Sequence, residues 1–537
     1  MMIRMTAGSV NKKFLMKKIF NKKLLHRLVL LFIFIQPLID MDYLLFEWLD
    51  RFGLPRFSTV IRFIILPLLV LWSFWLRDKN KKRTFFTALF YGVVFLIYFV
   101  LHVRQAEGLV ERLWLTDNFR FSMFQELTYV LTLCLPYAVI YFCCNEKPNT
   151  KEWKNMVVWS SALVSIPIVL GDLYVCAKST YYGDTVGNFF SWFSGIYEWY
   201  HPRTLASKFF FNEGNTIGIL LFMLLPLMYA CWLGEEDKKR KRRIFILILV
   251  QSLAMQMLAT RVATYGAVVI PVLFILVYLF DGFLLKHRKV QGKPILMCLL
   301  AAAIFGAILN WTPAVQNQRV DAKNDVALLH NGAIQFAADD LKGAEDLVPG
   351  SEEWINFYVY AFETYGINAR YIQSVPSMYY TEYYSYQHDP WFWTHVCLDI
   401  PVFDRVSGRQ IETIFFNYKY ENLTPAEKIL GMGYSTFMNG SIVLEKDFVQ
   451  QIYTLGYAGE VILLFPWIGI ILYGVVMFIK YRKQLWTLDN LCLVIAIGCG
   501  FGGAWLSGHY LDQFVTTMFT AFITAVLLNK VTEAKHA

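Results

Sequence analysis

Charged residues are scarce in this chain. Only 17% of its 537 residues are Asp, Glu, Lys or Arg, whereas 56% are hydrophobic. Soluble globular proteins carry about 25% charged residues on average. The shortage therefore excludes an ordinary soluble protein and favours one that crosses a membrane several times.

Several sequence motifs of enzymes are also missing. The chain has no GxxxxGK[ST] loop for nucleotide phosphates and no HExxH or GxSxG arrangement. Its nine cysteines form no CxxC pair, and only Cys397 lies well away from the apolar segments. We therefore expect no disulfide framework, no metal and no cofactor. The basic residues flank apolar segments, which argues against a nucleic-acid partner and for contact with membrane lipids.

Long apolar segments are what the sequence has in abundance. Twelve windows are long enough to cross a hydrocarbon core of ~30 Å, and they predict an all-α, polytopic integral membrane protein with about 12 transmembrane helices. The expected spans are 24–39, 58–76, 84–103, 125–144, 156–176, 214–233, 244–260, 262–285, 294–310, 449–479, 487–505 and 509–528.

The connectors between these segments alternate in charge. Lysine and arginine are concentrated at 77–83, 147–154, 235–243, 286–293 and 480–483, whereas the intervening connectors are acidic or mixed. Basic connectors stay in the cytoplasm. We therefore expect a multi-pass protein of the cell membrane with both termini in the cytoplasm and the longest connector outside.

That longest connector is the most unusual part of the chain. From Trp311 to Asp447 it holds 18 acidic and 9 basic residues, a net charge of −9, so the remainder of this +9 protein carries +18. We expect three regions: an N-terminal transmembrane bundle of about nine helices (1–310), a large extracytoplasmic loop domain (311–447) and about three C-terminal transmembrane helices (448–537).

Two arginines stand where an anion could bind. Arg261 follows Thr260 in the middle of the apolar stretch 244–285, where we expect two helices to meet at a tight external turn. Arg203 lies in the aromatic connector 177–213. A guanidinium at the outer bilayer surface can bind a phosphate or pyrophosphate bidentately. The alternative is that each arginine extends from a helix end into the interface.

The end of the loop carries a second group of candidates. Glu445 and Asp447 directly precede a transmembrane segment, and glycines lie on both sides of them at Gly431-Met432-Gly433 and Gly456-x-x-Gly459. One carboxylate can serve as a general base while the other caps the helix N-terminus. Alternatively, both are capping acids.

Aromatic residues crowd the middle of the loop. Tyr383, Trp391 and Trp393, with His388 between them, are candidates for contact with a glycan or an acceptor. They suit a small core or the membrane interface equally well. Asp40 and Asp42, in the first external connector, form an acidic pair that could hold a divalent cation or act as a base.

These features together resemble a known family. The similarity runs from Gln36-Pro37-Leu38-Ile39-Asp40, through the segment from Arg203 to Gly218 and the turn at Thr260-Arg261, to the loop end GMGYSTF and the GxxG-headed helix. By these motifs the chain resembles the O-antigen ligase and Wzy-type polymerase superfamily of bacterial surface-glycan enzymes, and the resemblance implies a GT-C-like membrane fold.

The resemblance also implies an activity. Such enzymes take a glycan from an undecaprenyl-pyrophosphate carrier and join it to a glycolipid or glycan acceptor on the outer face, with arginines on the pyrophosphate. This assigns that role first to Arg261 and then to Arg203. Where lipopolysaccharide ligases have a histidine, about eleven residues before GxxG, this chain has Glu445, which suggests a carboxylate base with Asp447 as its orienter or substitute.

The resemblance favours a ligase that attaches a teichoic-acid-like polymer to a glycolipid anchor. A polymerase of polysaccharide repeat units is the first alternative. A flippase or transporter of lipid-linked oligosaccharides is the second. A transferase that uses a lipid-monophosphate sugar, with Asp40 and Asp42 as its acidic motif, is the third.

Overall fold

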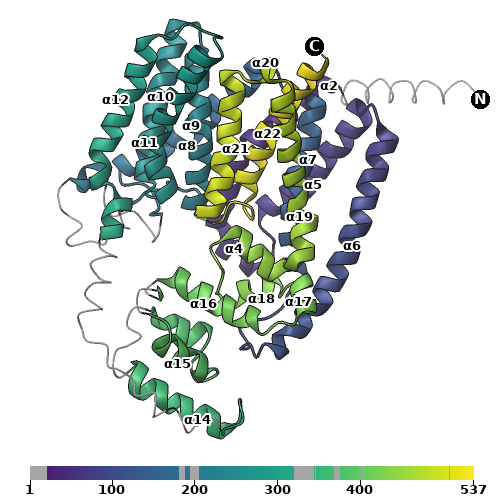
Figure 1. Cartoon of the computed structure of the whole chain (residues 1–537), viewed down its shortest axis with the longest axis vertical. Helices are drawn as coiled ribbons and strands as arrows, with labels where there is room; N and C mark the ends of the chain where they lie inside the picture. Colours follow the sequence, from purple (N-terminus) through teal and green to yellow (C-terminus); the bar gives the residue numbers. More distant parts are fainter. Residues whose placement is uncertain are drawn as a thin grey trace, which may run out of the picture. The chain divides into compact units, whose positions relative to one another are not determined.

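The computed structural model of the chain is helical (Figure 1). It describes residues 21–180, 188–193, 205–319, 341, 344, 346–367, 375–401, 404–405, 407–506 and 508–536. Within these residues, strand-like pairing is confined to one antiparallel bridge between Ser179 and Ser207. The all-α prediction is confirmed.

Ten of the described helices are long and apolar enough to cross a membrane, and a pair bent by 53° raises the number to 11. The chain is therefore a multi-pass membrane protein. The bent pair is α2 (Lys22–Phe34) with the segment Gln36–Arg51, which contains α3 (Gln36–Ile39), η1 (Asp40–Leu45) and α4 (Phe46–Arg51). The other candidates include α5 (Phe57–Arg77), α6 (Lys81–Arg112), α7 (Met123–Glu146), α8 (Thr150–Leu173), α9 (Gly214–Leu233), α11 (Arg261–Leu279) with η5 (Phe280–Leu284), and α12 (Gly292–Ile308) with η6 (Leu309–Trp311). The last three are α19 (Asp447–Lys480), α21 (Leu488–Leu506) and α22 (Phe514–His536).

The one predicted segment without a counterpart among these spans, 244–260, is also helical. It belongs to α10 (Lys238–Met257), which does not qualify as a span because its first six residues, KKRKRR, are all basic. The number of spans therefore differs from the expected 12 because the first residues of α10 are too charged for the hydrocarbon core. The helix pair itself is as predicted, since α10 ends at Met257 and α11 begins at Arg261.

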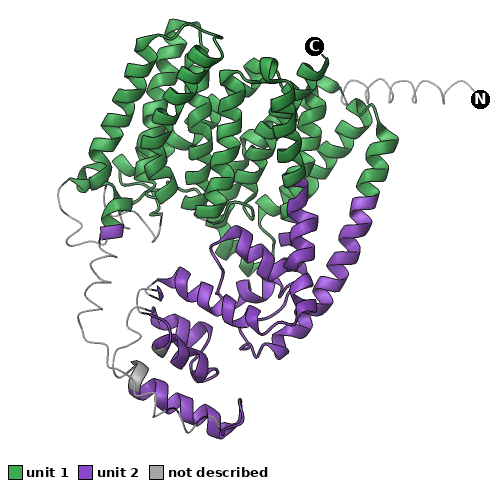
Figure 2. Cartoon of the chain, viewed as in Figure 1, with its two compact units in different colours: residues 1–89, 132–317, 467–537 green, residues 90–131, 318–466 purple. Residues whose placement is uncertain are grey.

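The contacts divide the chain into two compact units that do not follow its linear order (Figure 2). The first unit comprises residues 1–89, 132–317 and 467–537, and the second comprises 90–131 and 318–466. The second unit thus combines most of the loop 311–447 with parts of α6, α7 and α19. The division into 1–310, 311–447 and 448–537 is one of membrane topology, and it stays a prediction.

The first unit is a helix bundle with α9 near its centre. This helix is apolar on every side and almost completely buried, because α8, α10, α11 and α21 surround it. The last helix, α22, is buried to the same degree and packs against α9, α21 and α2. Most neighbouring helices are joined by short connectors, residues 174–213 between α8 and α9 are a long one, and α20 (Arg482–Leu485) links α19 to α21.

The second unit is built from shorter helices around an aromatic core. They are α14 (Glu352–Ala361), η8 (Phe362–Ile367), η9 (Tyr379–Tyr383), α15 (Pro390–Leu398), α16 (Gly408–Glu421), α17 (Pro425–Leu430) and α18 (Tyr434–Asn439). The helices α14, α15, α16 and α17 each begin with a side-chain cap. Ser407 with Gln410 begins α16, and Thr424 with Glu427 begins α17, each as a reciprocal capping box.

Candidate active site

Two glycines meet in the second unit, one at the end of the loop and one inside α19. Gly431 has φ +81° and Gly456 has φ +70°, backbone conformations that other residues rarely adopt. A Cβ atom on Gly431 would lie 2.4 Å from the amide nitrogen of Gly456, and one on Gly456 would lie 2.4 Å from the carbonyl oxygen of Ile429. The two backbones therefore touch, and only glycine fits at either position.

The contact interrupts α19. At Gly456 the helix is broken, and the carbonyl groups just before the break accept new donors. The amides of Met432 and Gly433 donate to the carbonyl oxygens of Tyr453 (3.0 Å) and Thr454 (2.8 Å). The Tyr98 hydroxyl donates to the carbonyl oxygen of Leu455 at 2.8 Å. These hydrogen bonds hold the start of the GMGYSTF segment against α19, directly before the break in that helix.

A buried histidine and a buried glutamate form hydrogen bonds to the backbone on both sides of the GMG segment. The Glu126 carboxylate accepts the amide protons of Tyr434 (3.0 Å) and Ser435 (2.7 Å) at the N-terminus of α18. His102 lies 2.8 Å from the same carboxylate through Nε2, and its Nδ1 donates to the carbonyl oxygen of Leu430 at 2.6 Å. Both side chains are fully buried. The pair therefore fixes both ends of the GMG segment.

Replacing Glu126 with Ala is expected to lower the free energy of unfolding by about 3–5 kcal/mol, the usual cost of removing one partner of a buried ion pair. The change leaves His102 and two amide groups without their acceptor. Thermal unfolding of the purified protein in detergent measures the loss. Glu107→Ala is the matched control, since Glu107 is exposed on α6 and should change stability by no more than about 0.5 kcal/mol. Equal melting curves for the two variants would remove this role from Glu126.

The two candidate carboxylates of the loop end lie in different surroundings. Asp447 is the first residue of α19 and is 3% exposed, at the positive end of the helix dipole. Glu445 stands in the bend before it, with 29% of its side chain exposed, and forms an ion pair with Arg409. Of the two, Glu445 is the one that solvent or a substrate can reach.

Arg409 lies in the first turn of α16, and Glu412 follows it on the same helix. The Glu412 side chain accepts a hydrogen bond of 2.7 Å from the Tyr379 hydroxyl. Burial, and then the charge of Glu412, raise the pKa of Tyr379, so its hydroxyl remains a donor. Arg409 is half exposed. The Glu445 carboxylate is thus oriented by a guanidinium that is itself open to solvent.

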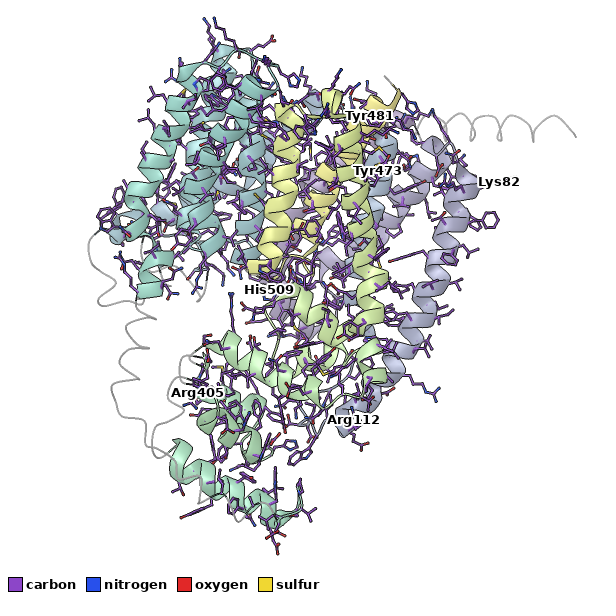
Figure 3. The ribbon with its side chains drawn as sticks, viewed as in Figure 1. Lys82, Arg112, Arg405, Tyr473, Tyr481 and His509 are labelled. Carbon is purple, nitrogen blue, oxygen red and sulfur yellow. The ribbon has the colours of Figure 1, made fainter. Side chains whose placement is uncertain are left out.

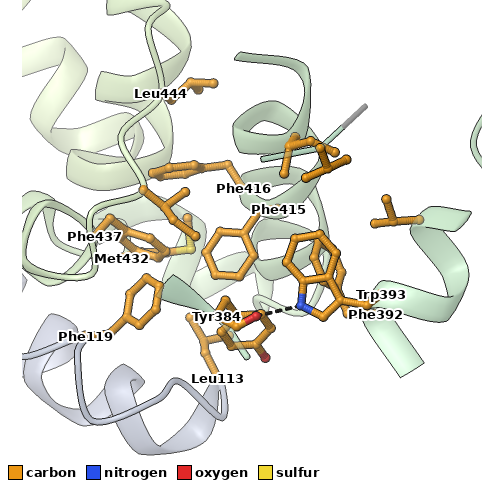
Figure 4. Close-up of a cluster of buried hydrophobic side chains, with 14 of the residues drawn as sticks. Leu113, Phe119, Tyr384, Phe392, Trp393, Phe415, Phe416, Met432, Phe437 and Leu444 are labelled. Carbon is orange, nitrogen blue, oxygen red and sulfur yellow. Dashed lines mark hydrogen bonds between the residues drawn. The ribbon is translucent and has the colours of Figure 1, made fainter. Parts of the chain in front are cut away.

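The aromatic residues of the loop mostly form its core (Figure 4). Trp393 is 1% exposed, and its indole N–H donates to the carbonyl oxygen of Tyr384 at 2.6 Å. The Trp393 ring therefore lies within the core, and contact of this residue with a glycan stays a prediction. Trp391, Tyr383 and His388 are only partly buried, so that role is still open to them. His388 also packs against Trp114, with ring centroids 4.8 Å apart.

A lysine is buried inside the same core. Lys419 is 2% exposed, and its Nζ donates to the hydroxyl oxygen of Tyr384 (2.6 Å) and to the carbonyl oxygen of Leu113 (2.9 Å). The Asp389 carboxylate is 3.9 Å from that nitrogen and accepts hydrogen bonds from Tyr384 and Tyr418. Burial lowers the pKa of Lys419 to about 8, although Asp389 acts in the opposite direction.

Lys419 should make the stability of the protein rise with pH between about 8 and 10. Its pKa is about 8 in the folded protein and 10.5 in the unfolded chain. The cost of burying the charged form is therefore complete below pH 8 and declines as the pH rises towards 10.5, because only the unfolded chain keeps the proton in that range. Relative to Lys419→Met, the wild type should gain about 2–3 kcal/mol between pH 7 and pH 10. Denaturant unfolding across this range measures the difference. Lys428→Met is the control, and parallel curves for wild type and Lys419→Met would contradict the expectation.

In the first unit, Arg261 is the first residue of the 19-residue helix α11, after the buried N-cap residue Thr260. Two hydrogen bonds hold the turn before it. The Ser207 amide donates to the carbonyl oxygen of Met257, and the Thr180 hydroxyl donates to the carbonyl oxygen of Leu258. The Arg261 side chain is exposed and has no ion pair with another described residue. A guanidinium at a positive helix end is suited to an anion.

Asp40 and Asp42 bind arginines within the first unit. Asp42 accepts from Arg56 at 2.6 Å and from the Ser58 amide at 2.6 Å, where it caps α5. Asp40 accepts from Arg62 at 2.7 Å, and Arg62 also donates to Gln36 at 3.0 Å. Both carboxylates are therefore occupied by guanidinium groups, and their contacts give no support to a cation between them. Arg203 and the neighbouring His201 lie outside the described residues.

A model of one protein family matches almost the entire chain. Its description is "O-antigen ligase like membrane protein", and the match covers residues 22–534. The chain belongs to the O-antigen ligase-like membrane protein family. No match was found among curated proteins. Membership confirms the resemblance seen in the sequence and identifies a membrane enzyme of the glycan ligase or polymerase type, which acts on a lipid-linked glycan and a glycan acceptor.

In this O-antigen ligase-like protein, three residues of the second unit were missed by sequence reasoning. His102 and Glu126 are ionisable residues inside apolar segments, and such residues deserve a functional hypothesis by default. That signal was available in the sequence. Arg409 gave no comparable signal, because it lies in a polar loop helix and its contact with Glu445 depends on the tertiary fold.

Proposed function

We propose that this O-antigen ligase-like protein transfers a glycan from an undecaprenyl-pyrophosphate carrier to an acceptor hydroxyl at the outer face of the bacterial cytoplasmic membrane. The finer proposal is a ligase that attaches a teichoic-acid-like polymer to a glycolipid anchor. The observation that carries it is the position of Glu445. This carboxylate is accessible, is oriented by Arg409, and stands at the end of the loop just before the glycine-broken helix α19.

Glu445 acts in this mechanism as the general base. It accepts the proton of the acceptor hydroxyl while that oxygen attacks the anomeric carbon of the donor glycan. The new glycosidic C–O bond forms as the bond from the anomeric carbon to the pyrophosphate oxygen breaks. The ion pair with Arg409 positions the Glu445 carboxylate, so the base needs little reorganisation during the reaction.

Arg261, together with Arg203, neutralises the departing pyrophosphate. The leaving group gains negative charge as its bond to the sugar breaks, and guanidinium groups bind phosphate oxygens bidentately. The exposed side chain of Arg261, which forms no ion pair with another residue that the structure describes, supports this role. The energy of transfer resides in the carrier's pyrophosphate, so the residues named here need only move a proton and stabilise charge.

Removing the protein from its cell and identifying the lipid-linked glycans that accumulate tests the proposal. A long polymer on the carrier lipid is the result expected for a ligase. Single repeat units on the carrier would instead identify a polymerase. An unchanged pool of lipid-linked glycan would contradict both activities.

A further inference from the structure

An apolar groove runs along the C-terminal part of α19 in the first unit. It encloses about 300 Å³ between α19, α21 and α22. Almost all of its lining is aliphatic or aromatic, with Trp467, Ile471, Val475, Phe478, Val494 and Val531 among the contributors. No polar network fills it, so its natural occupant is a hydrocarbon chain.

The length of the groove fits a chain from a single leaflet. Its lining residues on α19 run from Trp467 to Ile479, which corresponds to about 18 Å at a helix rise of 1.5 Å per residue. Half of a ~30 Å hydrocarbon core is about 15 Å. One acyl chain therefore matches the groove, whereas a long polyisoprenoid chain would extend beyond it.

The end of the groove is marked by three cations. Lys480, Arg482 and Lys483 follow the lining residue Ile479 directly, around Tyr481 (Figure 3). All three side chains are exposed, and none forms an ion pair within the described part of the chain. By contrast, the nearby groove residue Val531 follows Lys530, whose charge is already matched by Glu533 at 3.0 Å. The positive charge at the end of the groove is thus available to an external anion.

We propose that this groove is a binding site for an anionic two-chain phospholipid. One acyl chain lies against α19, α21 and α22, and the headgroup phosphate lies at Lys480, Arg482 and Lys483. A zwitterionic lipid would fill the groove but would leave the three cations without a net counter-charge. With the basic connector in the cytoplasm, the lipid belongs to the inner leaflet.

Gly474 offers a way to close the groove without disturbing the fold. It is one of the lining residues, and a Cβ atom added to it would meet no other atom within 4 Å. Gly474→Phe should therefore place its ring in the space of the acyl chain. Gly469, on the same helix, also has no atom within 4 Å of an added Cβ but does not line the groove. Gly469→Phe is the matched control.

The full-length protein in phosphatidylcholine vesicles tests the proposal. The vesicles carry a trace of phosphatidylglycerol with a photoactivatable acyl chain, or phosphatidylcholine with the same chain, and cross-linked peptides are identified by mass spectrometry. The phosphatidylglycerol probe should label α19, α21 and α22 about tenfold or more above the phosphatidylcholine probe, since each basic residue near a membrane surface strengthens binding of anionic lipid several-fold. Gly474→Phe should abolish that labelling, and Gly469→Phe should preserve it.

A Lys480→Gln, Arg482→Gln, Lys483→Gln variant separates the contributions of charge and groove. It should label equally with both probes, because the groove remains and the charge preference is gone. Equal labelling of the wild type by the two probes, or persistent labelling of Gly474→Phe, would overturn the proposal. So would displacement of the phosphatidylglycerol probe by an equimolar polyprenyl phosphate, which would assign the groove to the carrier lipid.

Discussion

Replacing Glu445 with Gln is expected to reduce glycan transfer by about 10²–10⁴-fold, the usual contribution of a positioned general base. Gln keeps the size of the side chain and can still accept a hydrogen bond from Arg409, but it cannot take a proton from the acceptor hydroxyl. The rate is measured with the purified protein in liposomes, using a lipid-pyrophosphate-linked glycan and a glycolipid acceptor. The loss should appear in kcat, since binding of the donor does not need this proton transfer.

Two further variants make this result specific. Glu353→Gln is the matched control, because Glu353 is exposed on α14 and should leave the rate unchanged. Asp447→Asn tests the other carboxylate of the pair. Asp447 is buried at the start of α19, so its replacement should cost about 0.3–1 kcal/mol of stability and little of kcat. A Glu445→Gln protein with the wild-type rate, or a larger loss of kcat in Asp447→Asn, would remove Glu445 as the base.

Replacing Arg261 with Ala is expected to reduce transfer by about 10²–10³-fold, as for the loss of one preorganised group that stabilises transition-state charge. The pyrophosphate then leaves without a guanidinium to receive its growing charge. Arg261→Lys should recover only part of the rate, because an ammonium group keeps the charge and loses the bidentate geometry. The same liposome assay measures both variants.

A suitable control for Arg261 is an arginine at another helix end that has no proposed contact with the pyrophosphate. Arg243 meets this need, since it is exposed among the basic residues that begin α10. Arg243→Ala should transfer glycan at the wild-type rate. If Arg261→Ala did so as well, the side chain would be an interface residue that extends from the end of α11 to the membrane surface.

The fold was predictable from the sequence because long apolar segments are a clear signal of transmembrane helices. Each of the twelve apolar windows overlaps helical residues, and Thr260-Arg261 marks the turn between α10 and α11 as expected. Three windows differ in detail, since 24–39 covers the bent pair α2 and α3, α19 breaks at Gly456, and α22 begins only at Phe514. Hydrocarbon length and backbone hydrogen bonding leave few alternatives for such segments. The loop 311–447 was not predictable in the same way, because its helices are short and their packing depends on side chains distant in the sequence.

The candidate site was predictable in its residues and less so in its contacts. The glycines at 431 and 456 stood out in the sequence, but nothing indicated that their backbones touch or that α19 breaks there. The pairing of Glu445 with Arg409 and the support from His102 and Glu126 likewise arise only in three dimensions. A sequence motif names the residues at a site, whereas their partners are chosen by the tertiary fold.

The aromatic core of the second unit has a consequence for how this protein is made. Phe119, from the connector between α6 and α7, is fully buried in that core and lies against the rings of Tyr384, Phe415 and Phe437. Ribosomes add about 5–20 residues per second, so Phe119 is synthesised roughly 15–50 s before Tyr384. The core therefore waits for most of the chain to emerge.

The same dependence limits what can be isolated. A secreted fragment of residues 311–447 would lack Phe119, Leu109 and Leu113, which complete its core, and would expose Phe415 and Phe437 to water. Such a fragment should aggregate when expressed alone. Folding of the loop thus depends on prior synthesis of the α6–α7 pair, because Leu109, Leu113 and Phe119 supply part of its core.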